Sequence, residues 1–85
     1  MNSKQKRILK TIFPDPVSAS IYWKDIESLF IALEAEVIEG SGSRVKFHKD
    51  GIIASFHRPH HPRKEAKPYQ VKDARTFLKQ LGVEP

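Results

Sequence analysis

Asp50-Gly51 restricts the fold of this chain more than any other feature, because it stands between two runs in which apolar and polar residues alternate. A two-residue hairpin turn of type I′ requires positive φ at both central positions, and Asp followed by Gly tolerates this requirement. The sequence therefore predicts a tight β-hairpin in which Lys49 pairs with Ile52. This pairing fixes the register of every other residue in the two strands.

The hairpin register separates the side chains into two faces, since successive side chains of a strand point to opposite sides of its sheet. The apolar set is expected to face the core, with Lys49 at its rim: Val45, Phe47, Ile52, Ala54 and Phe56. The opposite set is cationic and consists of Arg44, Lys46, His48, Ser55 and His57, with Ile53 as the single apolar residue. An RNA-facing sheet has this character, and so has a sheet whose polar face is simply solvated.

The histidines are concentrated around this hairpin. All four lie between Gly40 and His61, two in the strands and two in the loop that follows. In that loop Pro59 and Pro62 restrict themselves and the residues before them. The loop is therefore expected to be stiff, and a preorganised side chain loses less entropy when it engages a ligand.

The rest of the chain predicts three helices and one further strand. Apolar spacing and turn residues predict helices over residues 3–13, 23–35 and 69–81, a short strand over residues 36–39, and a helix stop at Gly82. Trp23 lies on an apolar helical stripe and is expected in the core. Pro14 ends the first helix, which must dock on the rest or remain loose.

The order of these elements is helix, helix, three strands, helix. It predicts a two-layer α+β domain in which both long helices cover one face of a three-stranded antiparallel sheet. The αβββα part is the order of a double-stranded-RNA-binding domain. The length of 85 residues is enough for one small domain, which we divide into an N-terminal extension over residues 1–19 and a core over residues 20–83.

Cysteine content and hydropathy restrict the possible fold classes and the location of the protein. The chain has no cysteine, which excludes a disulfide framework and a zinc ribbon. No apolar run approaches the length of a signal peptide or a membrane span, so we expect no membrane partner and a cytoplasmic location.

The basic charge is distributed unevenly. Residues 40–79 hold ten Lys and Arg against three acidic residues, whereas residues 11–39 hold one lysine against six acidic residues. A polyanion such as nucleic acid is the natural partner for a surface with this positive electrostatic field. A generally basic protein without such a partner would have the same composition. The candidate RNA contacts are Ser43, Lys46, Arg58, His60, Lys72 and Arg75. The turn over residues 40–43 could present backbone N–H groups to a phosphate or serve only as a connection.

Several segments together resemble the HicA toxin family, the small RNA-cleaving partners of type II toxin–antitoxin pairs. The resemblance covers about residues 20–83. It is carried by Leu33-Glu34-Ala35-Glu36-Val37, by the glycine-serine start of the second strand, by Lys49-Asp50-Gly51, and by Lys67-Pro68-Tyr69 with Phe77-Leu78-Lys79-Gln80-Leu81-Gly82-Val83. It implies a double-stranded-RNA-binding-like fold, endoribonuclease activity on mRNA, and neutralisation by a HicB-type antitoxin. We expect no cofactor.

One motif departs from the family pattern. Most members carry a Gly-Ser-His run whose histidine is catalytic. In this chain Arg44 follows Gly42-Ser43, and Gly42 follows Gly40-Ser41.

The hairpin register offers a replacement for that histidine, because it places Arg44 opposite His57. Metal-free RNA cleavage needs a base for the 2′-OH, an acid for the leaving 5′ oxygen, and a cation for the charge on phosphorus. We assign His57 as general base or acid and Arg44 as phosphate stabiliser. His48 or His60 is the second proton-transfer group, since histidine can serve either role near neutral pH.

Other functions are compatible with parts of the sequence. An RNA-binding module of the same fold without catalysis would use the same basic face. A zinc site built from His57, His60 and His61 with His48 has enough imidazoles, but no cysteine helps and adjacent histidines rarely both ligate. DNA binding has the same charge requirement but lacks a helix-turn-helix signal.

Overall fold

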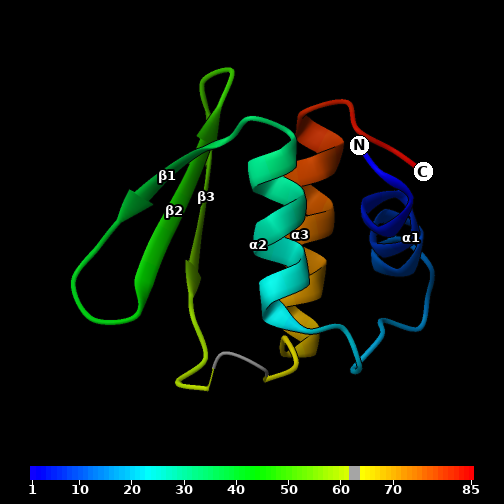
Figure 1. Cartoon of the computed structure of the whole chain (residues 1–85), viewed down its shortest axis with the longest axis horizontal. Coiled ribbons are helices and arrows are strands. Elements are labelled where there is room, and N and C mark those ends of the chain that lie inside the picture. Colours follow the sequence, from blue (N-terminus) through cyan, green and yellow to red (C-terminus); the bar gives the residue numbers. More distant parts are fainter. Residues whose placement is uncertain (62–63) are drawn as a thin grey trace.

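The computed structural model describes residues 1–61 and 64–85. Its elements are α1 (Ser3–Ile12), α2 (Trp23–Ala32), β1 (Glu36–Glu39), β2 (Arg44–Lys49), β3 (Ile52–His57) and α3 (Pro68–Gln80) (Figure 1). This is the predicted α+β fold with the αβββα order of a double-stranded-RNA-binding domain, preceded by one short helix. The part of the stiff-loop prediction that rests on Pro62 lies outside the described residues.

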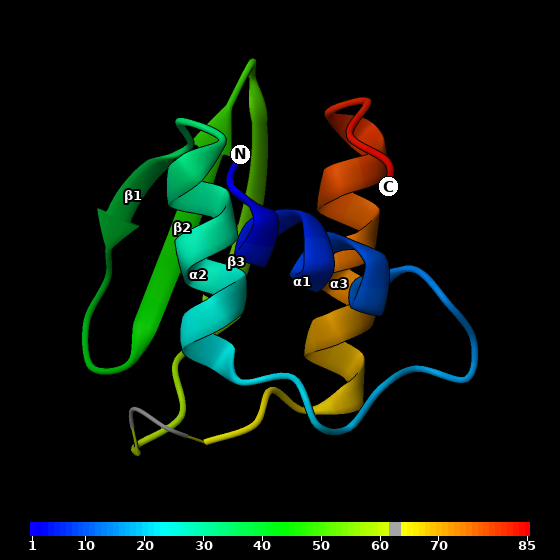
Figure 2. The ribbon, with the colours of Figure 1, turned by 45° about the vertical axis from the view of Figure 1, so that its right-hand side comes forward.

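The elements form three layers, one more than the predicted two, because α1 packs on the other helices. Helices α2 and α3 lie side by side over one face of the sheet, and α1 covers them on the side away from the sheet (Figures 1 and 2). Helix α1 is therefore docked and not loose, because Ile8, Leu9 and Ile12 are buried in the same hydrophobic cluster as the other helices. Among the described residues, no helix is long and apolar enough to cross a membrane.

The sheet has the strand order β1-β2-β3 and is antiparallel throughout. The predicted hairpin register is confirmed from Lys49 opposite Ile52 to Arg44 opposite His57. Asp50 has φ 53° and Gly51 has φ 79°, which is the pair of positive values that a type I′ turn requires.

Aromatic side chains join the helices to the inner face of the sheet. The ring of Phe30 on α2 lies edge-on to Phe47 of β2 and to Phe77 of α3, with centroid separations of 4.9 and 5.0 Å. Trp23 packs at 5.1 Å from Phe56 of β3 and is buried, which confirms it as a core residue. These contacts assign the apolar face of the hairpin to the core and leave the cationic face outward.

The second helix ends earlier than predicted, and backbone hydrogen bonds show why. Ala35 N–H donates to the Phe30 carbonyl at 3.1 Å and Glu34 N–H donates to the Ile31 carbonyl at 2.9 Å. This pair of bonds is a Schellman motif, whose C′ residue adopts the left-handed conformation. Glu34 takes that place with φ 67°. Helix α3 ends in the same motif, there with the predicted glycine, Gly82, at φ 76°.

Replacing Glu34 with glycine is expected to raise the free energy of unfolding by about 0.5–1 kcal/mol. The left-handed conformation costs a non-glycine residue roughly 1–2 kcal/mol, and the extra freedom of glycine in the unfolded chain offsets about half of the gain. Urea denaturation measures the change. The matched control is Glu36→Gly in the extended strand β1, which should lower stability. An unchanged midpoint for Glu34→Gly would contradict this account of how α2 ends.

Candidate functional site

The outer face of the sheet carries the cationic residues that the register predicted. Arg44, Lys46 and His57 are all exposed there. Arg44 lies directly opposite His57, and Lys46 lies between Ile38 of β1 and Ser55 of β3. The end of the sheet that holds Arg44 and His57 is therefore a point where a guanidinium and an imidazole can reach one phosphate.

His48 occupies the opposite end of this face. His48 pairs with Ile53, and Ile53 precedes His57 by four residues on β3. At the usual rise of a strand, this offset separates the two histidines by about 13 Å. Its Nδ1 lies 3.3 Å from Oε1 of Glu36 on the edge strand. The structure does not bring His48 to His57, so of the two predicted partners for proton transfer only His60 lies close to it.

A cleft of about 520 Å³ opens where β3 ends and the chain turns toward α3. Its walls include three of the four histidines, together with a turn residue of β1–β2 and two lysines that precede α3: His57, His60, His61, Ser43, Lys64 and Lys67. The cleft combines imidazoles with cations, which is the chemistry expected for a phosphodiester ligand.

Hydrogen bonds fix one side of this cleft. Gln70, a buried residue in the first turn of α3, donates through Nε2 to the carbonyl oxygen of His57 at 2.8 Å. The backbone N–H of Arg58 donates to the carbonyl of Ser43 at 2.8 Å. The end of β3 is thereby attached both to the start of α3 and to the turn between β1 and β2.

The opposite side is fixed by a short antiparallel bridge. Trp23 N–H donates to the Lys64 carbonyl at 3.0 Å, and Ala66 N–H donates to the Ile21 carbonyl at 2.7 Å. The segment before α3 is therefore anchored to the start of α2. Both walls of the cleft are attached to helices.

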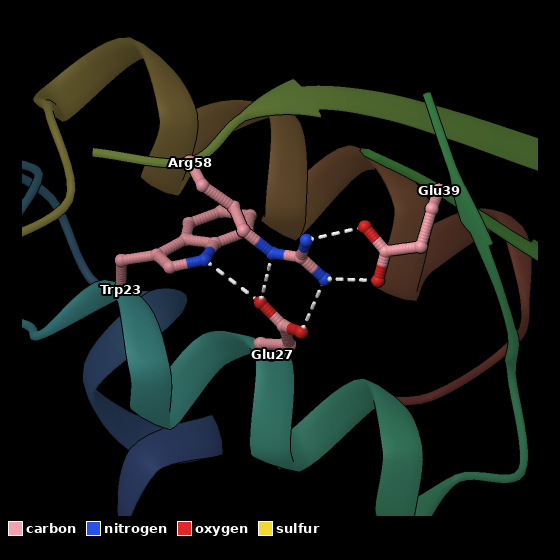
Figure 3. Close-up of polar contacts among 4 residues, drawn as sticks. All are labelled: Trp23, Glu27, Glu39 and Arg58. Carbon is pink, nitrogen blue, oxygen red and sulfur yellow. Dashed lines mark hydrogen bonds and ion pairs between the residues drawn. The ribbon is translucent and has the colours of Figure 1, made fainter. Parts of the chain in front are cut away.

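The side chain of Arg58 is held between two carboxylates (Figure 3). Its Nε and Nη2 donate to the two oxygens of Glu27 at 3.0 and 2.8 Å. Its Nη1 and Nη2 also donate to the carboxylate of Glu39. Trp23 completes the group, since its Nε1 donates to Glu27 at 2.9 Å. This set of four residues, the Arg58 network, links α2, the end of β1 and the exit of β3.

The network perturbs the charges within it. The hydrogen bonds that Arg58 donates to Glu27, and next those that it donates to Glu39, raise the pKa of Arg58, which therefore stays protonated. The hydrogen bond from Arg58 lowers the pKa of Glu39 below its ordinary value of 4.5. Because two carboxylates neutralise this guanidinium, Arg58 adds little to the positive field, although it was predicted as an RNA contact. Its position between His57 and Pro59 instead makes it a support for the wall of the cleft.

Two other predicted RNA contacts lie on α3, away from the cleft. Arg75 donates to the carbonyls of Ile12 and Pro14 and to the carboxylate of Asp15, each at 3.1 Å. It thereby attaches the segment after α1 to α3. Lys72 is exposed on α3 and does not line the cleft.

The sequence analysis did not assign several residues that line the cleft to the site, namely Lys64, Glu65, Lys67, Tyr69 and Gln70. The motif Lys67-Pro68-Tyr69 was used only as part of the family resemblance. Its position beside His57 depends on how the loop returns, which local sequence does not determine.

The described histidines do not form a metal site. Within residues 1–61 and 64–85, no three His, Asp or Glu side chains are grouped closely enough to hold a metal ion. His48, which the zinc alternative required, lies at the far end of the sheet.

The fold and this cleft can be compared with known proteins. The model of a family described as the HicA toxin of bacterial toxin–antitoxin systems matches residues 23–83. The chain belongs to this family. No curated protein and no solved structure matches it significantly. The HicA match begins with the first residue of α2 and ends just after α3, so it contains the sheet and the cleft and leaves α1 outside.

The Arg58 network makes the stability of this HicA toxin depend on pH through Glu39. Glu39→Gln is expected to lower stability at neutral pH. The deficit should shrink as pH falls below 4.5, because the unfolded chain then takes up a proton before the folded chain does. Urea midpoints from pH 7 down to 2.5 measure this difference.

The same substitution at Glu84, near the chain end, is the control for loss of one negative charge. A constant gap between wild type and Glu39→Gln at every pH would show that the ion pair with Arg58 does not cause the deficit.

Proposed function

We propose that this HicA toxin is an endoribonuclease that cleaves messenger RNA without a metal ion or cofactor and so inhibits translation and growth. One observation carries the proposal: Arg44 lies opposite His57, and His57 lines a cleft that also contains His60. Since mRNA is the substrate, the cytoplasm is the expected location.

The proposed reaction is attack of the RNA's own 2′ oxygen on the adjacent phosphorus. The new bond from the 2′ oxygen to phosphorus forms as the bond to the 5′ oxygen breaks. One of the two histidines, His57 or His60, accepts the 2′-OH proton through its imidazole. The other histidine donates a proton to the 5′ oxygen. Arg44 stabilises the negative charge that builds on the phosphate oxygens. The products are a 2′,3′-cyclic phosphate and a 5′-OH.

The RNA strand is expected to approach along the outer sheet face. Lys46 and Ser43 lie beside the reacting centre, and Lys64 and Lys67 extend the positive surface along the cleft. These residues would contact phosphates, which supply sequence-independent affinity that falls as salt rises. His48, at the opposite end of the same face, and Lys72 on α3 lie away from the reacting centre.

A second candidate is an RNA-binding module without catalysis. It is favoured by one observation, namely that Arg44 follows Gly42-Ser43 where the family usually has its catalytic histidine. Full-length RNA that stays bound to folded protein after long incubation would select this function.

His57→Ala is expected to slow RNA cleavage by about 10²–10⁴-fold, the usual contribution of a general acid or base. The side chain of His57 is exposed, so the variant should fold. A gel assay on a long single-stranded RNA with EDTA measures the rate, and end analysis should find 2′,3′-cyclic phosphates. His48→Ala is the matched comparison, since it removes an imidazole from the same sheet face far from the centre. Equal rates for wild type and His57→Ala would exclude the assigned chemistry.

Neutralisation by a HicB-type antitoxin is the second part of the proposal. An acidic surface of the antitoxin that covers Arg44, Lys46 and His57 would block the substrate and complement the charge of the sheet. Inhibition would then occur by occlusion of the reacting centre.

Lys46→Glu is expected to lower the affinity for a neutralising HicB-type antitoxin by at least about tenfold. The new carboxylate would face the acidic surface of the antitoxin, and like charges repel. Calorimetry with the purified antitoxin measures the affinity. Lys10→Glu makes the same charge change on the exposed face of α1, outside the matched region, and should leave the affinity nearly unchanged. Equal losses in both variants would point to a general charge effect and against docking on the sheet.

A further inference from the structure

We propose that Tyr69 is a stacking platform for one unpaired base, so that the cleft receives single-stranded RNA and not a duplex. The inference rests on the proposed function and adds the class of RNA that the site takes. It is carried by the exposure of Tyr69, by its fixed position relative to His57, and by the cations around it.

Tyr69 is an aromatic residue that the core does not use. The residue is 55% exposed, whereas Phe77 on the same helix is 1% exposed. The buried stripe of α3 consists of Gln70, Val71, Ala74, Phe77 and Leu78, and Tyr69 falls outside it. A large aromatic surface left in water beside a cleft is available to a ligand.

The position of Tyr69 relative to the proposed reacting centre is fixed by its neighbour. Gln70 donates from the first turn of α3 to the backbone carbonyl of His57 at 2.8 Å. The Lys67 N–H donates to Oε1 of the same Gln70 at 3.0 Å. One buried amide therefore holds the segment that carries Lys67 and Tyr69 against the residue that carries the imidazole, and all three side chains line one cleft.

The remaining walls have the chemistry of a nucleotide site. Among the described residues that line the cleft, Lys64, Lys67, His60 and His61 can supply positive charge, the charge of Arg58 is neutralised, and Glu65 is the one carboxylate. Cations contact the phosphates of a bound strand and an aromatic ring accepts the face of a base, which is the combination that single-strand binding sites use.

The ring discriminates between single and double strands for a geometric reason. In a duplex each base is covered on both faces by its neighbours, so an aromatic side chain reaches a base face only where the base is unpaired and splayed out. Stacking on a ring tolerates every base. Tyr69 is therefore expected to favour single-stranded RNA without choosing its sequence.

The experiment uses the full chain and an eight-nucleotide 2′-O-methyl RNA of mixed sequence, which lacks the attacking 2′-OH and stays intact. Fluorescence anisotropy at fixed salt gives its affinity as a single strand and as a blunt duplex. Tyr69→Ala is expected to weaken single-strand binding by about 5- to 150-fold, the range measured for base–aromatic stacking. Tyr69→Phe keeps the ring and should bind as wild type does, and duplex affinity should not change.

Tyr22→Ala is the matched control, because Tyr22 is also an exposed tyrosine but does not line the cleft. Circular dichroism checks that each variant is folded. Three outcomes would overturn the inference: single-strand affinity unchanged in Tyr69→Ala, equal losses for single strand and duplex, or an equal loss in Tyr22→Ala. If wild type cleaves RNA while one of these holds, the proposed function stands without this subsite. If wild type neither binds nor cleaves RNA, both proposals fail.

Discussion

The contact between Arg58 and its two carboxylates is the constraint on which the geometry of the cleft depends. It is the point where α2, the edge strand β1 and the exit of β3 meet. The two carboxylates contribute differently, since the side chain of Glu39 is 64% exposed and that of Glu27 only 20%. Solvent screens the pair with Glu39, whereas loss of Arg58 would leave Glu27 partly buried without its charge partner. The pair with Glu27 is therefore the main support of Arg58, and it orients the chain between His57 and Pro59.

Local interactions explain why much of the fold could be predicted. A two-residue turn fixes the hairpin register, and the register separates core residues from surface residues, so Arg44 opposite His57 followed from the sequence. The left-handed Glu34 could not be foreseen, because a Schellman motif without glycine leaves no signal in composition. The partners of Arg58 were also hidden. Glu27 lies 31 residues away along the chain, and a loop arginine beside histidines has the sequence appearance of a free cation.

In the candidate site too, the residues placed by local interactions were predictable and those placed by long-range contacts were not. Strand positions were predictable, but the residues that close the cleft come from a loop that returns to α3, and its path depends on long-range contacts. The bond from Gln70 to the His57 carbonyl is the clearest case, since Gln70 was read only as part of a helix. It brings Tyr69 and Lys67 to the same cleft as His57, and it leaves His48, which is closer to the hairpin turn, outside.

The register also accounts for how a HicA toxin could work without the usual histidine after Gly-Ser. Opposite residues of adjacent antiparallel strands have Cβ atoms about 4.5–5.5 Å apart, which is less than the reach of an arginine or a histidine side chain. A phosphate held in front of Arg44 is therefore also in front of His57. In the proposed mechanism, the imidazole of His57 on β3 would take the role that the family usually gives to the histidine after Gly-Ser, and the guanidinium of Arg44 would add a fixed positive charge.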